Sequence, residues 1–208
     1  MYIDRKGTLQ FMSNVKTREF WKNPRGTIAC VYKDNDICYA TSGMYSSSFI
    51  IRECLRFYQR QNKDFHVENM WEEKTMLEVG CGTGRIARLI SYFFKSVYGY
   101  DPVPECIEIA KLECQPMKFD NLTYGTTIPE NGIWDASCCI SVIEHLNEAD
   151  TLDVLRLLKK HTKPGGPITI VFHTKWNGSA MKQMFGPGAY KEWETWKPCL
   201  VEKVFTND

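Results

Sequence analysis

The sequence lacks both a long apolar run and a large excess of charge of one sign. No uninterrupted apolar stretch reaches the roughly 18 residues that a membrane-spanning helix needs. Residues 1–6 lack the apolar core of a signal peptide. The formal net charge is +1, so no strong field favours nucleic acid, an anionic membrane or an acidic substrate. We therefore expect a cytoplasmic protein with no membrane partner and no indicated nucleic-acid partner.

Paired cysteine motifs are also missing. The nine cysteines are odd in number and scattered, and none forms a Cys-x-x-Cys pair. This pattern does not favour a disulfide framework. Cys138 and Cys139 are adjacent inside an apolar run, so they should point to opposite faces of a strand and fill the core. The length of 208 residues suits one full domain with a small appendage.

The N-terminal third of the chain predicts a small cap. Two short apolar runs, 27–32 and 37–41, flank a polar turn and are typical of two strands. Residues 46–60 follow a helical period, with their apolar side chains mostly on one face. We expect residues 1–70 to form a cap over the carboxyl edge of a sheet, where Tyr39, Met44 and Tyr45 either reach the ligand or simply pack.

From residue 71 onward, strands and helices alternate. The expected strands are 75–79, 96–100, 122–124, 134–141 and 168–173, and the expected helices are 85–94, 104–113 and 149–161. Alternation of this kind predicts βαβ units with a parallel sheet. The fold class is therefore α/β, with a doubly wound, mostly parallel sheet in a Rossmann-like domain over 71–208.

The C-terminal end is short for such a sheet. After residue 175 the sequence offers one short helix at 181–185 and one strand at 200–205. We expect a shortened sheet, or one that pieces of the N-terminal segment complete. Trp176, Phe185, Trp193 and Trp196 either form an aromatic substrate pocket or cover the core.

A glycine-rich loop follows the first predicted parallel strand. It reads Glu78-Val-Gly80-Cys81-Gly82-Thr-Gly84. Glycines permit positive φ and close approach of the backbone to a ligand, and the start of the next helix favours an anionic carboxylate. The nicotinamide fingerprint requires a third glycine where Arg85 stands, so a dinucleotide is the weaker alternative. Glu78 suits a ligand with an ammonium group, bound directly or through water.

An acidic residue ends the second strand. Asp101 lies 21 residues after Gly80, where a carboxylate would bridge the two hydroxyls of a ribose. Taken alone, Asp101 before Pro102 is equally typical of a helix cap. Combined with the glycine loop in a strand–helix–strand context, it predicts a nucleoside-containing cofactor.

These motifs resemble those of class I S-adenosylmethionine-dependent methyltransferases. Residues 77–87 resemble the first motif, Asp101 the acidic motif after the second strand, and residues 134–146 and 158–170 the fourth- and fifth-strand motifs. The resemblance covers about residues 70–175. It is specific for fold and cofactor and weak for substrate, and the sequence resembles the ubiquinone-biosynthesis-type small-molecule methyltransferases.

The resemblance implies roles for individual residues. The loop backbone at Gly80, Cys81 and Gly82 would hold the methionine part of S-adenosylmethionine, and Asp101 would hold the ribose. The remaining cofactor positions would be Glu78, Gly84, Pro102, Val103, Thr126, Thr127, Ile140 and Ser141. Relatives often have an acid near the adenine, and Thr126 or Thr127 stands in its place here.

Residues 141–145 resemble a Glu-x-x-Glu-His segment that can bind a divalent metal in some relatives. Ser141 replaces the first carboxylate, so we predict no metal site, although Glu144, His145 and His173 carry suitable ligand atoms. Glu144 is then expected to cap a helix. A hydroxyl acceptor would need a base, for which His145 is the first candidate and His173 the second.

The sequence thus predicts an enzyme, a methyltransferase that uses S-adenosylmethionine and releases S-adenosylhomocysteine. The expected partner is a small-molecule methyl acceptor with an oxygen or nitrogen nucleophile. Two alternatives stay open: a nucleic acid or protein as acceptor, and a non-catalytic cofactor-binding subunit.

Overall fold

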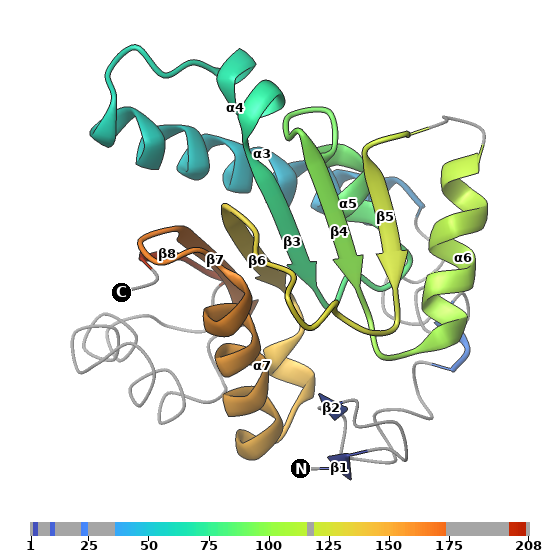
Figure 1. The fold of residues 1–208 in the computed structure, drawn as a ribbon. Helices are drawn as coiled ribbons and strands as arrows, with labels where there is room; N and C mark the ends of the chain where they lie inside the picture. The colour runs from blue at the N-terminus through green and yellow to red at the C-terminus, as the bar shows by residue number, and fades with distance from the viewer. Residues whose placement is uncertain are drawn as a thin grey trace.

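The computed structural model describes residues 2–3, 9–10, 22–24, 36–115, 119–173 and 200–206, which form a sheet between layers of helices (Figure 1). The strands of the main sheet are β3 (Thr75–Val79), β4 (Ser96–Tyr100), β5 (Leu122–Gly125), β6 (Ala136–Ile140), β7 (Pro167–His173) and β8 (Leu200–Thr206). Their order is β5-β4-β3-β6-β7-β8, with β8 antiparallel to β7 and the other pairs parallel. Two short strands, β1 (Tyr2–Ile3) and β2 (Leu9–Gln10), pair separately.

Helices pack on both faces of the sheet, which confirms the doubly wound α/β prediction. They are α3 (Asp36–Gln61), α4 (Val67–Glu73), α5 (Arg85–Ile90), α6 (Pro104–Cys114), the 3-10 turn η2 (Ile143–His145) and α7 (Glu148–His161). Side chains of α3, α4, α5 and α6 share one core cluster, and those of α7 and η2 share the other. Nearly every residue of β3 and β6 is buried, as expected for parallel strands that are covered by helices on both faces.

Alternation along the central strands divides the two cores. Met76 belongs to the cluster under α3 and α5, whereas Leu77 and Val79 belong to the cluster under α7. Cys138 and Cys139 are both fully buried and join opposite clusters. The prediction that these two cysteines fill the core on opposite faces is confirmed.

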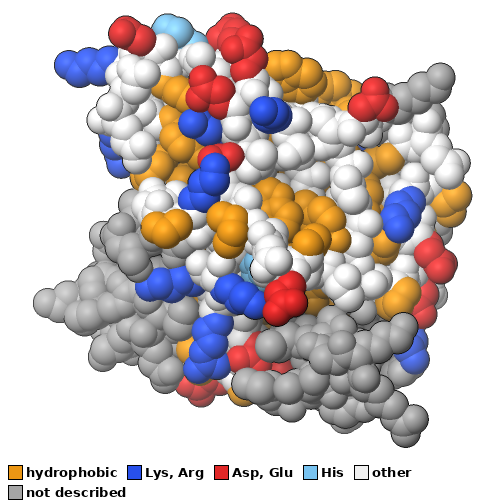
Figure 2. All heavy atoms as spheres, in the orientation of Figure 1, with side chains coloured by type: hydrophobic (Ala, Val, Ile, Leu, Met, Phe, Trp, Pro, Cys, Tyr) orange, Lys and Arg blue, Asp and Glu red, His pale blue; other side chains and the backbone are white. Residues whose placement is uncertain are grey.

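The connection from β5 to β6 contains no helix over residues 126–135. Instead, Trp134 packs against Tyr98, with ring centroids 5.5 Å apart, and against His161 at 6.1 Å. Figure 2, drawn from the same side as Figure 1, shows hydrophobic side chains gathered near the middle of this face, over the region of β3 and β4.

The predicted strand at 37–41 is wrong, because those residues belong to α3. The predicted start of this helix near Ser46 is also wrong, since α3 begins at Asp36. Ser47 lies inside the helix and satisfies its hydroxyl by donating to the Gly43 carbonyl oxygen at 2.8 Å. Local β propensity at 37–41 is overridden by packing of the long helix against α5 and the sheet.

Other predicted bounds hold with smaller changes. α5 ends at Ile90 rather than 94, and α4 was not predicted. The predicted last strand is confirmed as β8, so the C-terminal segment completes the sheet. The predicted strand at 27–32, the predicted helix at 181–185 and the predicted aromatic group at 176–196 lie outside the described residues. Division of the chain at residue 70 stays a prediction.

No helix within the described ranges is both long and apolar enough to cross a membrane. The cytoplasmic location expected from the sequence stays a prediction.

Candidate functional site

The parallel register brings the glycine loop and Asp101 to the same edge of the sheet. Val79 of β3 pairs with Tyr100 of β4, so both chains leave the sheet side by side. The Gly80 and Cys81 N–H groups donate to the Tyr100 carbonyl oxygen at 2.7 and 3.0 Å. The Gly82 N–H donates to Asp101 Oδ2 at 2.9 Å. The loop is therefore held by the neighbouring strand before any ligand binds.

Three loop glycines have positive φ, but only two of them are enclosed. Gly80, at φ 77°, has space for no side chain, since a Cβ there would lie 2.3 Å from Val142 Cγ2. A Cβ on Gly84 would lie 2.3 Å from the Tyr124 hydroxyl oxygen. Gly82, at φ 53°, has no atom within 4 Å of its Cβ position. The open side of Gly82 is where a ligand can approach the backbone closely.

Glu78 is a buried acid with an unused oxygen. It is 2% exposed, and its carboxylate accepts the N–H of Ala87 in the first turn of α5. Its Oε2 atom is buried without a hydrogen-bond partner. Burial raises the pKa of Glu78 to about 8, against the opposing effects of the Arg85 charge and the Ala87 N–H. A buried, unpartnered carboxylate oxygen is costly unless a cation or donor completes it.

Asp101 holds two pieces of backbone at once. Its Oδ1 accepts the Val103 N–H and its Oδ2 accepts the Gly82 N–H, both at 2.9 Å. Burial raises the pKa of Asp101 to about 6, although these two N–H groups act in the opposite direction. The side chain thus caps the turn before α6 and anchors the loop. Each oxygen keeps a second lone pair for a ligand hydroxyl.

The end of β6 forms the other wall of this edge. Ser141 has φ 53° and is the one non-glycine residue with positive φ in the described part of the chain. Its N–H donates to the Val171 carbonyl oxygen at 2.7 Å, and the next residue, Val142, closes over Gly80. A serine in this conformation stores backbone strain, which packing of the surrounding strands maintains.

The remaining predicted cofactor residues surround the same edge. Cys81, Pro102, Val103 and Ile140 are buried. Thr126 is half-buried and Thr127 is exposed, and the Tyr98 hydroxyl donates to the Thr127 carbonyl oxygen at 2.6 Å. Burial is the main cause that raises the pKa of the Cys81 thiol well above its usual value. Because the thiolate is the nucleophilic form, this thiol is not a nucleophile.

His145 ends η2 with an exposed side chain, and its N–H donates to the Val142 carbonyl oxygen at 2.9 Å. The side chains of Glu144 and His173 lie outside the described residues. Among the side chains that are described, no three His, Cys, Asp or Glu residues are grouped for a metal ion. The sequence-based expectations of His145 as a base and of no metal site therefore stay predictions.

Two contributors to the site were not found from the sequence. Tyr124 lies beneath the loop and donates its hydroxyl to the Gly84 carbonyl oxygen at 3.1 Å. Its ring also requires glycine at position 99, where a Cβ would lie 2.5 Å from Tyr124 Cδ1. Gly43 of α3 lies against the Arg85 side chain. Both depend on contacts between distant segments, and no local pattern signals them.

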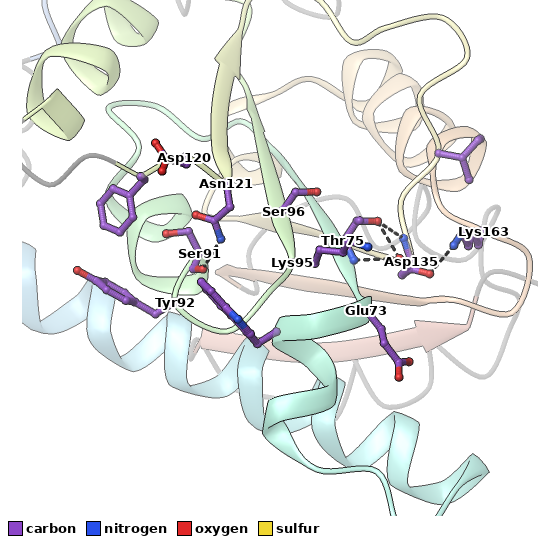
Figure 3. Close-up of a pocket in the computed structure, with 13 residues that line it drawn as sticks. Glu73, Thr75, Ser91, Tyr92, Lys95, Ser96, Asp120, Asn121, Asp135 and Lys163 are labelled. Carbon is purple, nitrogen blue, oxygen red and sulfur yellow. Dashed lines mark hydrogen bonds and ion pairs between the residues drawn. The ribbon is translucent and has the colours of Figure 1, made fainter.

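A separate hollow of about 850 Å³ lies at the amino end of the strands (Figure 3). Asp135 Oδ2 accepts both the N–H and the hydroxyl of Thr75, at 2.9 and 2.8 Å, and Oδ1 binds Lys163. Asn121 donates to the carbonyl oxygens of Ser91 and Phe94 at 2.8 and 2.9 Å. These polar groups bind one another and the backbone, so this hollow has the character of a structural junction.

Comparison with known proteins gives one family match. A family described as "Methyltransferase domain" matches residues 48–204. The ubiquinone biosynthesis O-methyltransferase of Vibrio parahaemolyticus is 33% identical over 101 residues, which cover 46% of this chain and 42% of that protein. Its counterpart from Bradyrhizobium is 25% identical over 170 residues, covering 80% of this chain and 62% of the relative. The chain therefore spans less than two thirds of the length of these relatives.

A solved structure shares the fold over most of both chains. The magnesium protoporphyrin IX methyltransferase of Synechocystis, solved with bound S-adenosylmethionine, superposes with a TM-score of 0.59 at 15% identity. The match covers 86% of this chain and 85% of that one. At this identity the likeness concerns the fold.

Proposed function

Since this chain belongs to the methyltransferase domain family, we propose that it transfers the methyl group of S-adenosylmethionine to an oxygen or nitrogen of a small molecule. S-adenosylhomocysteine would be released. The observation that carries the proposal is the pairing of an unpartnered, buried Glu78 Oε2 with the open side of Gly82 at one edge of the sheet.

The residues present fit this cofactor. An ammonium group would complete the buried Glu78 carboxylate, directly or through a water molecule. The ribose hydroxyls would bind the remaining lone pairs of Asp101, with Pro102 and Val103 beside the adenine. Because the N–H groups of Gly80, Cys81 and Gly82 already donate within the fold, the methionine part would contact the open Cα face of Gly82.

The bound cofactor supplies an electrophilic methyl group, so the chain's own task is to position the acceptor and exclude water. Thr126, Thr127, Ile140 and Ser141 would line the cofactor. For a hydroxyl acceptor, we assign the proton-accepting role to His145, whose exposed ring follows the strained end of β6.

The proposed acceptor is a small molecule. The curated relatives reported above are named as O-methyltransferases of ubiquinone biosynthesis, and the formal net charge of +1 supplies no field for a nucleic acid. A cytoplasmic location is part of the same proposal.

Titration calorimetry with S-adenosylmethionine, S-adenosylhomocysteine and a nicotinamide dinucleotide tests the cofactor. We expect the first two to bind and the third not to bind, and binding of the dinucleotide alone would overturn the proposal. Asp101→Ala should weaken binding of both sulfur compounds. If they bind but no small-molecule hydroxyl or amine is methylated, the chain is a non-catalytic binding subunit or acts on a macromolecule.

The proton-accepting role has its own test. His145→Ala should lower turnover of a hydroxyl acceptor by about 100-fold or more, with the Kd for S-adenosylmethionine unchanged. A small effect on turnover would remove His145 from the mechanism and leave the cofactor assignment intact.

A further inference from the structure

Arg85 occupies an unusual position between a neighbouring helix and a buried acid. It is the first residue of α5, where a cation is opposed by the helix dipole. Its charge acts on Glu78, which lies beneath the same helix end. On its other side is Gly43 of α3, where a Cβ would lie 2.9 Å from both Arg85 Cγ and Cδ and 3.2 Å from Nη1.

We propose that Arg85, held against Gly43, is a positioning residue whose charge favours the ionised form of Glu78, which is the form that binds the cofactor's ammonium group. This inference rests on the proposed function, because it concerns the same site. It adds that α3, from the N-terminal third of the chain, holds in place the arginine whose charge acts on the glycine-loop acid.

The surroundings of Glu78 explain why a cation is needed. Burial favours the neutral acid, and a second buried carboxylate, Asp101, disfavours another negative charge. The Ala87 N–H and the Arg85 charge act in the opposite direction. The other titratable groups that act electrostatically with Glu78 are Cys81, Tyr124 and Cys138. Their pKa values are raised, so they are neutral near pH 7, and Arg85 is the cation in this set.

The glycine of α3 makes this arrangement possible. Glycine inside a helix costs about 1 kcal/mol relative to alanine, so Gly43 is not explained by helix stability. A methyl group there would meet the Arg85 stem at less than the ordinary contact distance. The Arg85 side chain would then have to move relative to Glu78.

The signature of this role is the pH dependence of cofactor binding. An ammonium group binds the ionised form of Glu78, so affinity should rise with pH up to the pKa of Glu78 in the free protein. An opposite charge nearby lowers the pKa of an acid by about one unit or more. Removing Arg85 should therefore move the midpoint upward by about one pH unit and weaken binding about tenfold at pH 7.

Calorimetry with S-adenosylhomocysteine between pH 6 and pH 9.5 tests the proposal on the full chain. The variants are Arg85→Met, which removes the charge, Arg85→Lys, which keeps it, and Gly43→Ala, which displaces the side chain. Arg88→Met is the matched control, since Arg88 is on the same helix and pairs with Glu113 instead. The ligand's own ammonium titrates equally in every arm, so differences between variants report the protein.

We expect an upward shift for Arg85→Met, a smaller one in the same direction for Gly43→Ala, and the wild-type midpoint for Arg85→Lys and Arg88→Met. An unchanged midpoint in Arg85→Met, or tighter binding, would overturn the inference, because the arginine would then be indifferent or a competitor for Glu78. If Arg85→Met does not fold, Gly43→Ala gives the same test. Absence of binding by the wild-type protein would instead refute the proposed function.

Discussion

The two ends of the central sheet use their polar groups in opposite ways. At the carboxyl end, three glycines and Ser141 hold positive φ angles, and a buried Glu78 oxygen has no partner. At the amino end, Asp135 binds both Thr75 and Lys163 at the wall of the hollow of about 850 Å³ (Figure 3). These polar groups of the hollow are therefore already satisfied by one another and by the backbone. The end that we assign to the ligand is marked by a buried carboxylate oxygen without a hydrogen-bond partner and by a strained backbone at Ser141.

Of the substitutions at the carboxyl end, Gly80→Ala should have the largest effect on stability. A Cβ at this position would lie 2.3 Å from Val142 Cγ2, on a backbone with φ 77°. Overpacking and the left-handed conformation together should lower the free energy of unfolding by about 3 kcal/mol or more. Urea unfolding measures this loss. In a double-mutant cycle, Val142→Ala should restore part of it, whereas simple additivity would show that the contact is not the cause.

The two ends should also differ in how their contributions to stability depend on pH. Burial raises the pKa of Glu78 from 4.5 to about 8, so the contribution of Glu78 to the stability of the unliganded fold is greatest below pH 4.5 and falls as pH rises toward 8. Burial also acts to raise the pKa of Asp135, but hydrogen bonds from Lys163 and Thr75 outweigh it and the net pKa is lowered. Stability from Asp135 is present above pH 3.8 and is lost as pH falls through its folded pKa.

Two isosteric amides test these signs. In unliganded protein, Glu78→Gln should gain stability over wild type between pH 5 and 8, at up to about 1.4 kcal/mol per pH unit. Asp135→Asn should cost about 2 kcal/mol at pH 7, a cost that shrinks in acid, and should leave the affinity for S-adenosylhomocysteine unchanged. Parallel pH profiles for the two variants would contradict the contrast between the ends.

The sequence allowed prediction of those parts of the fold that are fixed by local pattern. The continuous apolar strands, the glycine loop and Asp101 can each be recognised from a short stretch of sequence, without knowledge of which segments pack against it. The contacts of Tyr124 with Gly84, and of Gly43 with Arg85, depend on strand register and helix docking, which no local pattern encodes. The helical state of 37–41 was missed for the same reason, because its packing partners are distant in sequence.

A matched pair of glycines gives a finer comparison. Gly82 at the carboxyl end and Gly165 at the amino end have φ values of 53° and 73°, and a Cβ on either would meet nothing within 4 Å. Alanine at each should cost about 1 kcal/mol of stability through backbone strain alone. Only Gly82→Ala should also weaken cofactor binding, by about tenfold or more, because its methyl group would occupy the ligand side. Equal affinities in calorimetry would show that the open side of Gly82 is not where the ligand lies.

Substitution of Ser141 should give the smallest effect on stability, and this effect should be stabilising. Its φ of 53° costs a serine about 1 kcal/mol, which glycine would avoid, so Ser141→Gly should raise the thermal midpoint by a few degrees. If the strain serves to fix the end of β6 beside the cofactor, the same variant should lower methyl transfer while it stabilises the fold. Ser141→Ala is the control, because it removes the hydroxyl and keeps the strain. Loss of activity in both variants would assign the role to the hydroxyl, and loss only in the glycine variant would assign it to the backbone.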